Sequence, residues 1–437
     1  MPAHGLIIGG IESGGGKTAV TCLLLAGLRG RGFPVQPYKA GPDFIDPAYH
    51  ERFSGVASRN LDEWLLGTAG IEAEIAATLS GKIGVVEGVM GLFDGGSAGS
   101  DEGSTFALAR QLGWPIMLVA PCAKAGRSLA AVLRGFLEEA RHEPIVGVIL
   151  NEVSGPGHAD YLKEAIAPLN LPVFGWLPRE ELLHWPERHL GLQASQEMRL
   201  PGWLELAQLA ERWLDLRGLL DLVTPAPPAP AAPPAASERT IAVIKDEVFH
   251  FYYPSNLDFL RERGARLIEV SALRDTALPA GIQALYIGGG FPEEFAFALA
   301  DNYGLRADIR RAVESGLPCY AECGGLMYLA EELATGNGRR FPMAGLLPGR
   351  VEMTTRLQHF GYCTAQRDTL TVHGHEFHHS RWLAEAERAN LWRVCKKRSG
   401  ESRTEGYQRH RLHASYVHIM FRAAPAFAVA AFGWPEE

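Results

Sequence analysis

The stretch Gly10-Ile11-Glu12-Ser13-Gly14-Gly15-Gly16-Lys17-Thr18 decides the fold of the first half of this 437-residue chain. A short apolar run, 6–8, precedes it, and an apolar-periodic stretch, 19–28, follows it. This order predicts a strand, a glycine-rich turn and a helix, which together form the context of a phosphate-binding loop. Glycines let backbone N–H groups surround the phosphate oxygens, and the helix N-terminus adds positive potential. A flexible glycine turn without a ligand is the alternative interpretation.

The end of this loop predicts phosphate and metal contacts. Lys17 is expected to reach the β- and γ-phosphates, and Thr18 is expected to offer its hydroxyl to Mg²⁺. The spacing departs from the usual Gly-x4-Gly-Lys pattern, which would need glycine in place of Ile11. Five residues separate Gly10 from Gly16 here, so the loop is one residue longer than the usual form.

The charge, hydropathy and cysteine content of the chain argue against several classes of protein and partner. The formal net charge of -8 argues against a nucleic-acid-binding protein, which normally has a basic balance. No apolar run reaches the roughly 20 residues of a membrane-spanning helix, and no signal-peptide pattern opens the chain. None of the six cysteines forms a Cys-x-x-Cys pair, so neither a disulfide framework nor a zinc site is indicated. We therefore expect a cytoplasmic enzyme with reduced thiols and with no nucleic-acid or membrane partner.

The pattern of elements predicts two α/β domains joined by a linker. Short apolar runs alternate with helical patterns in the first half, which predicts a parallel sheet with helices on both faces. The stretch 225–238 is rich in proline and alanine and is expected to be an extended linker between domains at 1–224 and 239–437. The predicted strands are 6–8, 35–38, 83–86, 116–119, 146–150, 173–176, 240–244, 265–269 and 284–287, and the predicted helices are 19–29, 105–111, 129–141, 258–263 and 305–315.

Acidic residues follow two strands of the predicted first sheet. Asp43 and Asp46 lie in a glycine- and proline-containing loop after the strand 35–38, and Glu87 ends the strand 83–86. Ligands of open α/β sheets collect at the carboxyl ends of the strands, so these acids are expected near the phosphate-binding loop. Glu87 would then be a second Mg²⁺ ligand or would position its water. A plain turn with solvated acids and a strand-end acid that caps the next helix are the alternatives.

The second half contains a candidate nucleophile. Cys323 follows a strand and opens a helix, and small residues stand two positions to either side, which is typical of a nucleophile elbow. A helix N-terminus lowers the pKa of a thiol and favours the thiolate. The backbone N–H of Gly324, with another from Gly289 or Gly290, could form an oxyanion hole. A buried structural cysteine is the alternative for Cys323, and it is the reading we favour for Cys319.

A thiolate nucleophile needs a base, and several histidines are available. His418 is the first candidate, and His413 is the second. The cluster 373–379 contains four further histidines, but their spacing alternates as in a strand, so their side chains divide between two faces. We therefore interpret that cluster as structural and not as a metal site.

These motifs together resemble the cobyrinate a,c-diamide synthase family, which are glutamine-dependent amidotransferases of corrin biosynthesis. The resemblance runs nearly end to end, and it explains the longer phosphate-binding loop, a feature also of dethiobiotin synthetase. It rests on the stretches 13–18, 39–47 (Lys-Ala-Gly-Pro-Asp-Phe-Ile-Asp-Pro), 58–62 (Ser-Arg-Asn-Leu-Asp), 87–95 (Glu-Gly-Val-Met-Gly-Leu-Phe-Asp-Gly), 251–253, 288–293, 322–326 (Glu-Cys-Gly-Gly-Leu), 374–378 and 414–418.

The resemblance implies an enzyme with two sites. An N-terminal ATPase domain like that of dethiobiotin synthetase would phosphorylate a carboxylate, and a C-terminal class I glutamine amidotransferase domain would supply ammonia through Cys323 and His418. The partners implied are ATP, glutamine and a tetrapyrrole; a homodimer is compatible with the sequence, which does not report the oligomeric state. By the resemblance, ATP would contact Gly10, Ser13, Gly14, Gly15, Gly16, Lys17 and Thr18, Mg²⁺ would be held by Thr18, Asp43 and Glu87, and the substrate would face Lys39, Asp46 and Asp94.

Two features of the sequence leave alternatives open. Many class I glutaminase domains carry His-x-Glu, and the family often shows His-x-His, but Met420 stands at that place. We therefore expect a Cys–His dyad in which another group orients His418. The family pattern does not identify the tetrapyrrole, so hydrogenobyrinate, sirohydrochlorin, its nickel form and siroheme remain alternatives to cobyrinate. A P-loop regulatory ATPase with an inert glutaminase-like domain is the alternative from another functional class.

Overall fold

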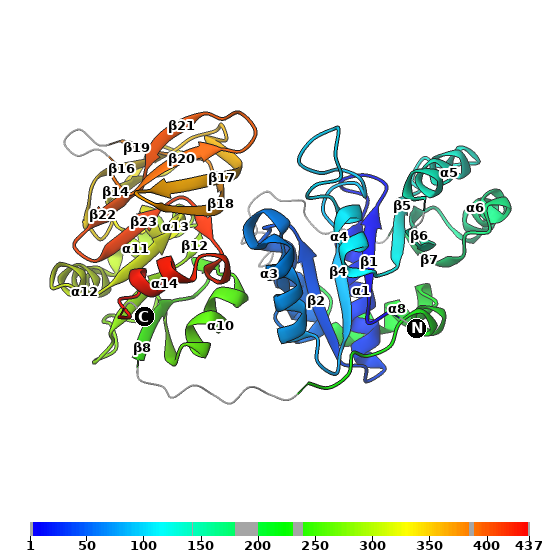
Figure 1. Ribbon diagram of the computed structural model, residues 1–437, viewed down its shortest axis with the longest axis horizontal. Coiled ribbons are helices and arrows are strands. Elements are labelled where there is room, and N and C mark those ends of the chain that lie inside the picture. Colours follow the sequence, from blue (N-terminus) through cyan, green and yellow to red (C-terminus); the bar gives the residue numbers. More distant parts are fainter. Residues whose placement is uncertain (1–2, 142, 180–199, 230–238, 384–388, 436–437) are drawn as a thin grey trace. The chain divides into compact units, whose positions relative to one another are not determined.

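The computed structural model describes residues 3–141, 143–179, 200–229, 239–383 and 389–435. The chain divides into two compact units, Met1–Ala231 and Ala232–Glu437, and each is described by itself (Figure 1). The division falls within the stretch 225–238 predicted as a linker. Residues 230–238 lie outside the described residues, so the linker stays a prediction. None of the helices in the described ranges is long and apolar enough to span a membrane.

The first unit is built on a sheet of seven strands. These strands are β1 (Gly5–Gly10), β2 (Val35–Ala40), β3 (Arg59–Leu61), β4 (Ile83–Glu87), β5 (Ile116–Pro121), β6 (Ile145–Val153) and β7 (Val173–Pro178). They are all parallel, in the order β3-β2-β4-β1-β5-β6-β7. Every strand predicted for this half is present, and β3 is an addition.

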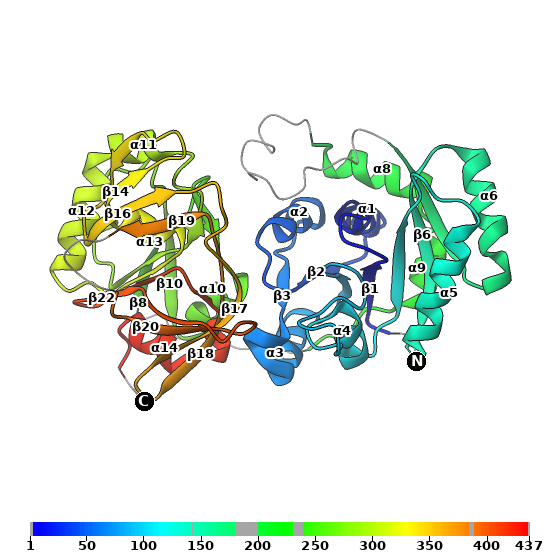
Figure 2. The same cartoon turned by 90° about the horizontal axis from the view of Figure 1, so that it is seen from above.

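Helices cover both faces of this sheet, as expected. Figure 2 shows α1, α2 and α8 on one side and α3 and α4 on the other. Because both faces are covered, the central strands are buried along their whole length, which explains apolar runs where an exposed sheet would alternate. The helices are α1 (Lys17–Gly30), α2 (Ile45–Ser54), α3 (Glu63–Thr78), α4 (Thr105–Leu112), α5 (Ser128–Ala140), α6 (Pro156–Ile166), α8 (Trp203–Trp213) and α9 (Leu216–Leu222).

The order of the strands positions the predicted site. β4 lies between β1 and β2. Glu87 of β4 pairs with Ile8 of β1 on one side and with Lys39 of β2 on the other. The carboxyl ends of these three strands therefore meet at one edge of the sheet. The loops that leave them are the phosphate-binding loop, the loop with Asp43 and Asp46, and the loop after Glu87.

The second unit contains a six-stranded sheet. Its strands β10, β8, β11, β13 and β23 are parallel, and β22 adds antiparallel at the edge. The predicted helix 258–263 begins earlier, at Pro254, because proline suits the first turn of a helix. The strands are β8 (Arg239–Ile244), β10 (Ala265–Val270), β11 (Ala284–Ile287), β13 (Cys319–Glu322), β22 (Tyr407–Arg409) and β23 (Leu412–Ser415), and the helices are α10 (Pro254–Glu262), α11 (Ala296–Asp301), α12 (Tyr303–Glu314), α13 (Gly324–Tyr328) and α14 (Pro425–Ala431).

Three smaller sheets complete this unit, and the sequence analysis did not predict them. Five strands pair antiparallel in the order β21-β20-β17-β18-β24, four pair as β15-β14-β16-β19, and two as β12-β9. The histidine-rich stretch forms β18, as its alternation predicted. The strands are β9 (Phe249–Phe251), β12 (Gly289–Gly290), β14 (Ala330–Ala334), β15 (Arg340–Pro342), β16 (Leu347–Met353), β17 (His359–Arg367), β18 (Leu370–His378), β19 (Ser380–Leu383), β20 (Trp392–Lys396), β21 (Ser402–Glu405) and β24 (His418–Ile419).

Candidate active sites

The predicted phosphate-binding loop connects β1 to α1. Lys17 begins α1, and its Nζ donates hydrogen bonds to the carbonyl oxygens of Met90, at 2.6 Å, and Glu12, at 3.2 Å. Thr18 donates from Oγ1 to Glu87 Oε1 at 2.7 Å. The loop therefore brings its lysine and its hydroxyl to the loop after β4, as the strand order requires.

A residue that the sequence analysis missed packs against this loop. Asn151, near the end of β6, donates from Nδ2 to the carbonyl oxygen of Gly15 at 3.1 Å. Gly16 has φ +91°, and a Cβ placed there would lie 2.0 Å from Asn151 Nδ2. Two features thus favour glycine at position 16: its left-handed backbone conformation, and the Asn151 side chain that lies where a Cβ would be. Asn151 directly follows the predicted strand 146–150, and this position was the sequence signal that could have identified it.

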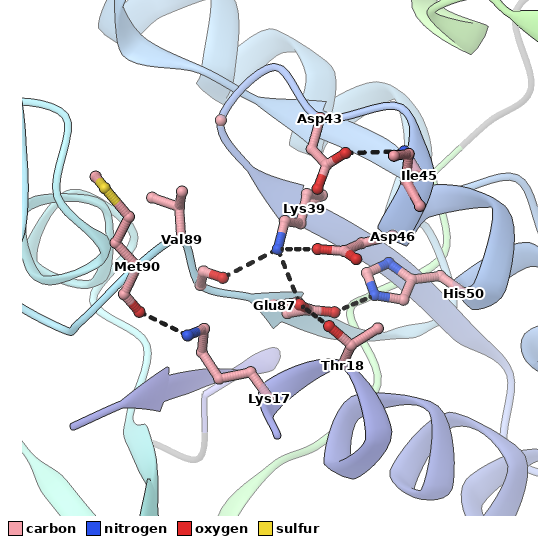
Figure 3. A network of polar contacts seen from close by, with 12 residues as sticks. Lys17, Thr18, Lys39, Asp43, Ile45, Asp46, His50, Glu87, Val89 and Met90 are labelled. Carbon is pink, nitrogen blue, oxygen red and sulfur yellow. Dashed lines mark hydrogen bonds and ion pairs between the residues drawn. The ribbon is translucent and has the colours of Figure 1, made fainter. Parts of the chain in front are cut away.

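A buried lysine joins the acids predicted for this edge (Figure 3). Lys39 Nζ lies 2.6 Å from Asp46 Oδ2 and 2.8 Å from Glu87 Oε1, and it also donates to the carbonyl oxygen of Gly88 at 3.1 Å. Burial alone would lower the pKa of Lys39, but the carboxylates of Asp46 and Glu87 outweigh that effect and raise it. The lysine is therefore a charged ammonium held between carboxylates.

The other oxygen of Glu87 is held by a histidine that the sequence analysis also missed. His50, on α2, is fully buried, and its Nε2 lies 2.5 Å from Glu87 Oε2. Its Nδ1 lies 3.0 Å from Ser58 Oγ. Glu87 therefore has both carboxylate oxygens engaged, one by His50 and the other by Thr18 and Lys39 (Figure 3).

Asp43 and Asp46 interact with each other, and their pKa values shift in opposite directions. Burial and the neighbouring Asp46 raise the pKa of Asp43. The pKa of Asp46 is lowered, since Lys39 and the hydrogen bond with Asp43 outweigh the effect of burial. Asp43 Oδ1 accepts from the N–H of Ile45 at 2.8 Å. Its Oδ2 is buried and accepts no hydrogen bond from the part of the chain that the structure describes.

Asp94 stands apart from this cluster in its contacts. Its side chain is exposed, and Oδ2 accepts from the N–H of Gly91 at 2.8 Å, which closes a tight turn. A substrate contact by Asp94 stays a prediction.

The donor set at this edge fits Mg²⁺ in its chemistry. The predicted ligands Thr18, Asp43 and Glu87 offer a hydroxyl and two carboxylates, the hard oxygen donors that Mg²⁺ prefers beside nucleotide phosphates. The buried Oδ2 of Asp43 is an acceptor available for such an ion. Lys39 Nζ contacts one of these predicted ligands, Glu87 Oε1, so a bound metal would share that oxygen with the ammonium.

The second candidate site is the elbow between β13 and α13. Cys323 follows β13 with φ +49° and ψ -105°, an uncommon backbone conformation for a residue with a side chain. Its N–H donates to the carbonyl oxygen of Ser415 on β23 at 2.8 Å. A Cβ at Gly325 would lie 2.4 Å from the carbonyl oxygen of Ile287, which explains the small residue two positions after the cysteine. The strand, turn and helix predicted around Cys323 are thus present.

The predicted oxyanion glycines are packed around the elbow. A Cβ at Gly324 would lie 2.9 Å from the backbone nitrogen of Gly290, and one at Gly289 would lie 2.8 Å from His418 Cε1. Gly290 has φ +154°, and a Cβ there would lie 1.8 Å from the carbonyl oxygen of Val248. These glycines let backbone groups approach the elbow closely. Their role as oxyanion donors stays a prediction.

His418 contacts both the cysteine and an acid. Its Nδ1 lies 3.2 Å from Glu322 Oε2, and both side chains are buried. Burial lowers the pKa of His418, but hydrogen bonds with Cys323 and Glu322 outweigh it and raise the pKa to about 10. Cys323, His418 and Glu322 therefore form one contiguous group, and the sequence analysis identified only the first two as a pair.

The remaining histidines have different surroundings. His375, on β18, stacks on His418 with ring centroids 5.0 Å apart, and its Nε2 lies 2.5 Å from the hydroxyl of Tyr253. Burial, and secondarily His418, lowers the pKa of His375, so it is a neutral neighbour. His413, the second candidate base, lies on β23 and packs edge-on against Phe427. Within the described ranges, no three His, Cys, Asp or Glu side chains are grouped as metal ligands.

Comparisons with known proteins cover both units. Residues 6–192 match the family profile of the CobQ/CobB/MinD/ParA nucleotide binding domain, and residues 240–426 match that of the CobB/CobQ-like glutamine amidotransferase domain. The curated cobyrinate a,c-diamide synthase of Syntrophotalea carbinolica is 40% identical over 98% of both chains. The enzyme of the same name from Salmonella typhimurium is 40% identical over 97% of this chain and 96% of its own, and that from Priestia megaterium is 37% identical over 96% and 95%.

Proposed function

Because this chain belongs to the cobyrinate a,c-diamide synthase family, we propose that it amidates the a and c acetate groups of cobyrinate with ATP and glutamine. The observation that carries the proposal is the presence in one chain of two complete constellations. One is an elbow cysteine in contact with a buried histidine; the other is a phosphate-binding loop whose threonine reaches a buried carboxylate. A carboxylate is a poor electrophile and ammonia is scarce at neutral pH, so both constellations are needed.

The second unit would release ammonia from glutamine. Transfer of the Cys323 proton to His418 gives a thiolate–imidazolium pair, in keeping with the raised pKa of His418, and the sulfur attacks the carboxamide carbon to form a tetrahedral intermediate. The oxyanion would be met by N–H groups at Gly324 and at Gly289 or Gly290. His418 returns the proton to the leaving nitrogen as the C–N bond breaks, which leaves a thioester and free ammonia. Water then hydrolyses the thioester to glutamate and restores the thiol.

The first unit would activate the carboxylate. A substrate carboxylate oxygen attacks the γ-phosphorus of ATP, ADP leaves, and an acyl phosphate forms. Ammonia then attacks the acyl carbon, inorganic phosphate leaves, and a proton is lost to give the amide. Lys17 would hold the phosphates, and Lys39, Asp46 and Asp94 would orient the substrate. Thr18, Asp43 and Glu87 would hold Mg²⁺, which when bound neutralises phosphate charge.

Mass spectrometry of the products tests this proposal. Purified protein with ATP, Mg²⁺ and glutamine is offered cobyrinate, hydrogenobyrinate and sirohydrochlorin in parallel. Each exchange of OH for NH₂ lowers the mass by about 1 Da, because acyl substitution replaces one group by the other. We expect two successive exchanges on cobyrinate. Exchange on sirohydrochlorin alone would contradict the substrate, and ATP hydrolysis without exchange on any of the three would contradict the amidation.

A further inference from the structure

The position that holds an acid in many glutaminases of this class holds an apolar residue here. Met420 stands two residues after His418 and is buried, and its thioether can neither accept a proton nor orient an imidazole. The acid in contact with His418 comes instead from β13: Glu322 Oε2 lies 3.2 Å from His418 Nδ1. That acid is the residue immediately before Cys323.

The Glu322 carboxylate is itself held in place. Tyr320 donates from its hydroxyl to Glu322 Oε1 at 2.6 Å, which leaves Oε2 for the imidazole. Residues two apart on a strand point to the same face, so Tyr320 and Glu322 meet as a consequence of β13 being extended. The side chains of His418 and Glu322 are only 3% and 1% exposed. Little water competes for this contact, so it has a fixed geometry and a strong electrostatic effect.

Several other groups of the described chain lie around His418, and Glu376 and His378 interact with it electrostatically. His375 stacks on the ring from β18 and is neutral, Gly289 lies against Cε1, and Cys323 faces it from the elbow. An imidazole that donates from Nδ1 to a carboxylate leaves Nε2 as its proton acceptor. The same carboxylate stabilises the imidazolium that forms when the thiol proton is taken.

We propose that Glu322 is the positioning residue of the glutaminase site and completes a Cys323–His418–Glu322 triad in which acid and nucleophile are neighbours in sequence. The inference rests on the proposed hydrolysis of glutamine. It replaces the expectation of a dyad with a triad whose acid comes from the nucleophile's own strand. Cys323 and Glu322 are adjacent at the elbow between β13 and α13, so this single turn positions both the nucleophile and the acid of the triad.

The test compares Glu322→Gln with Glu405→Gln in glutamate release from glutamine. Glu405 is a matched control, because it is a buried carboxylate in the same unit whose partners are the Ser415 hydroxyl and the N–H of Tyr416. We expect Glu322→Gln to lower kcat by roughly 10²- to 10⁴-fold with KM within about 3-fold, as when a triad acid is replaced by its amide. The limb of the pH profile that reports the imidazole should move to lower pH, since the imidazolium loses its carboxylate. Glu405→Gln should keep the wild-type kcat and pH profile.

Three results would overturn the inference. One is a Glu322→Gln enzyme with kcat within about 3-fold of wild type, and another is a rise in KM at constant kcat, which would make Glu322 a glutamine-binding residue. If Glu322→Gln does not fold, the Tyr320→Phe variant tests the inference instead. It keeps the aromatic ring but loses the hydrogen bond to Glu322, so kcat should fall roughly 3- to 10-fold, the usual effect of one hydrogen bond. The third result that would overturn the inference is a Tyr320→Phe enzyme whose kcat and pH profile are unchanged. A wild-type protein that amidates with ammonium salts but releases no glutamate would overturn the proposed glutaminase itself.

Discussion

His50 and Glu87 are in direct contact, with 2.5 Å between the imidazole Nε2 and the carboxylate Oε2. Ser58 Oγ lies 3.0 Å from the other imidazole nitrogen, so a chain of contacts runs from Ser58 through His50 to Glu87. Glu87 Oε1 meets Thr18 and Lys39. The histidine therefore fixes the rotation of the carboxylate and determines which of its oxygens faces the phosphate-binding loop.

Removing His50 should impair the synthetase site and leave the glutaminase intact. In His50→Ala, Glu87 loses the partner of one buried oxygen and can rotate. We expect amidation with either glutamine or ammonium to fall roughly 10- to 100-fold, with a higher Mg²⁺ requirement, as when the hydrogen-bond partner of a metal ligand is removed. Glutamate release should stay at the wild-type rate. Glu51→Ala, an exposed change on the same helix, is the control; equal amidation by the two variants would refute a positioning role for His50.

Replacing the nucleophile should separate the two activities. We expect Cys323→Ala to abolish amidation with glutamine but to keep amidation with added ammonium salts, because the carboxylate is activated in the other unit. Both rates are measured by product mass. Cys319→Ala is the matched control, since Cys319 lies on β13, the strand that leads to Cys323, and burial raises the pKa of its thiol. Loss of both activities in a folded Cys323→Ala protein would argue against two separate sites.

Gly290 should tolerate no side chain. In Gly290→Ala the new Cβ would lie 1.8 Å from the carbonyl oxygen of Val248, so the backbone beside the elbow must shift. Glutamate release should fall by roughly 100-fold or more, the effect of displacing one oxyanion donor. Gly336→Ala, at an exposed position with no atoms within 4 Å of the new Cβ, should have no effect. A Gly290→Ala enzyme with normal glutamate release would show that no donor depends on this backbone.

His413 should make the protein sensitive to mild acid. Burial lowers the pKa of His413 to about 4 from the ordinary 6.5. Between pH 6.5 and 4 the unfolded chain binds this proton and the folded one does not, so stability falls as the pH is lowered through this window. Because the ring is partly exposed, we expect the wild type to lose only about 2 kcal/mol more than His413→Phe between pH 7 and 4. Urea unfolding over this pH range measures the difference.

The control for that experiment is His373→Gln, an exposed histidine on β18. Its curve of unfolding free energy against pH should follow that of the wild type. If His413→Phe also follows the wild type, protonation of His413 does not contribute to acid destabilisation.

The elements around both candidate sites could be predicted because they depend on local sequence. A strand, a glycine-rich turn and a helix are determined by apolar pattern and backbone freedom within about 15 residues. The left-handed backbone at Gly16, with φ +91°, is of this kind, because glycine adopts it readily. The parallel strands of the first unit were equally clear, because burial on both faces gives continuous apolar runs.

The partners of the site residues could not be predicted, because the packing of distant elements against one another brings them together. His50 and Glu87 are 37 residues apart, and Glu322 and His418 are 96 apart. Single-sequence patterns carry no information about such pairs. Glu322 did offer one signal: an acid at the end of a buried, otherwise apolar strand. The antiparallel sheets were missed because strands such as β17 and β18 carry polar and apolar residues in an irregular mixture.

The buried ammonium of Lys39 acts as an internal counter-ion for the acids around it. Its Nζ lies 2.6 Å from Asp46 Oδ2 and 2.8 Å from Glu87 Oε1. A cation bound by Glu87 Oε1 would share that oxygen with the covalently attached ammonium of Lys39. An arriving polyphosphate would restore electroneutrality, so nucleotide and metal should load together and not one after the other. Charge balance among these side chains thus governs what binds at this edge of the sheet.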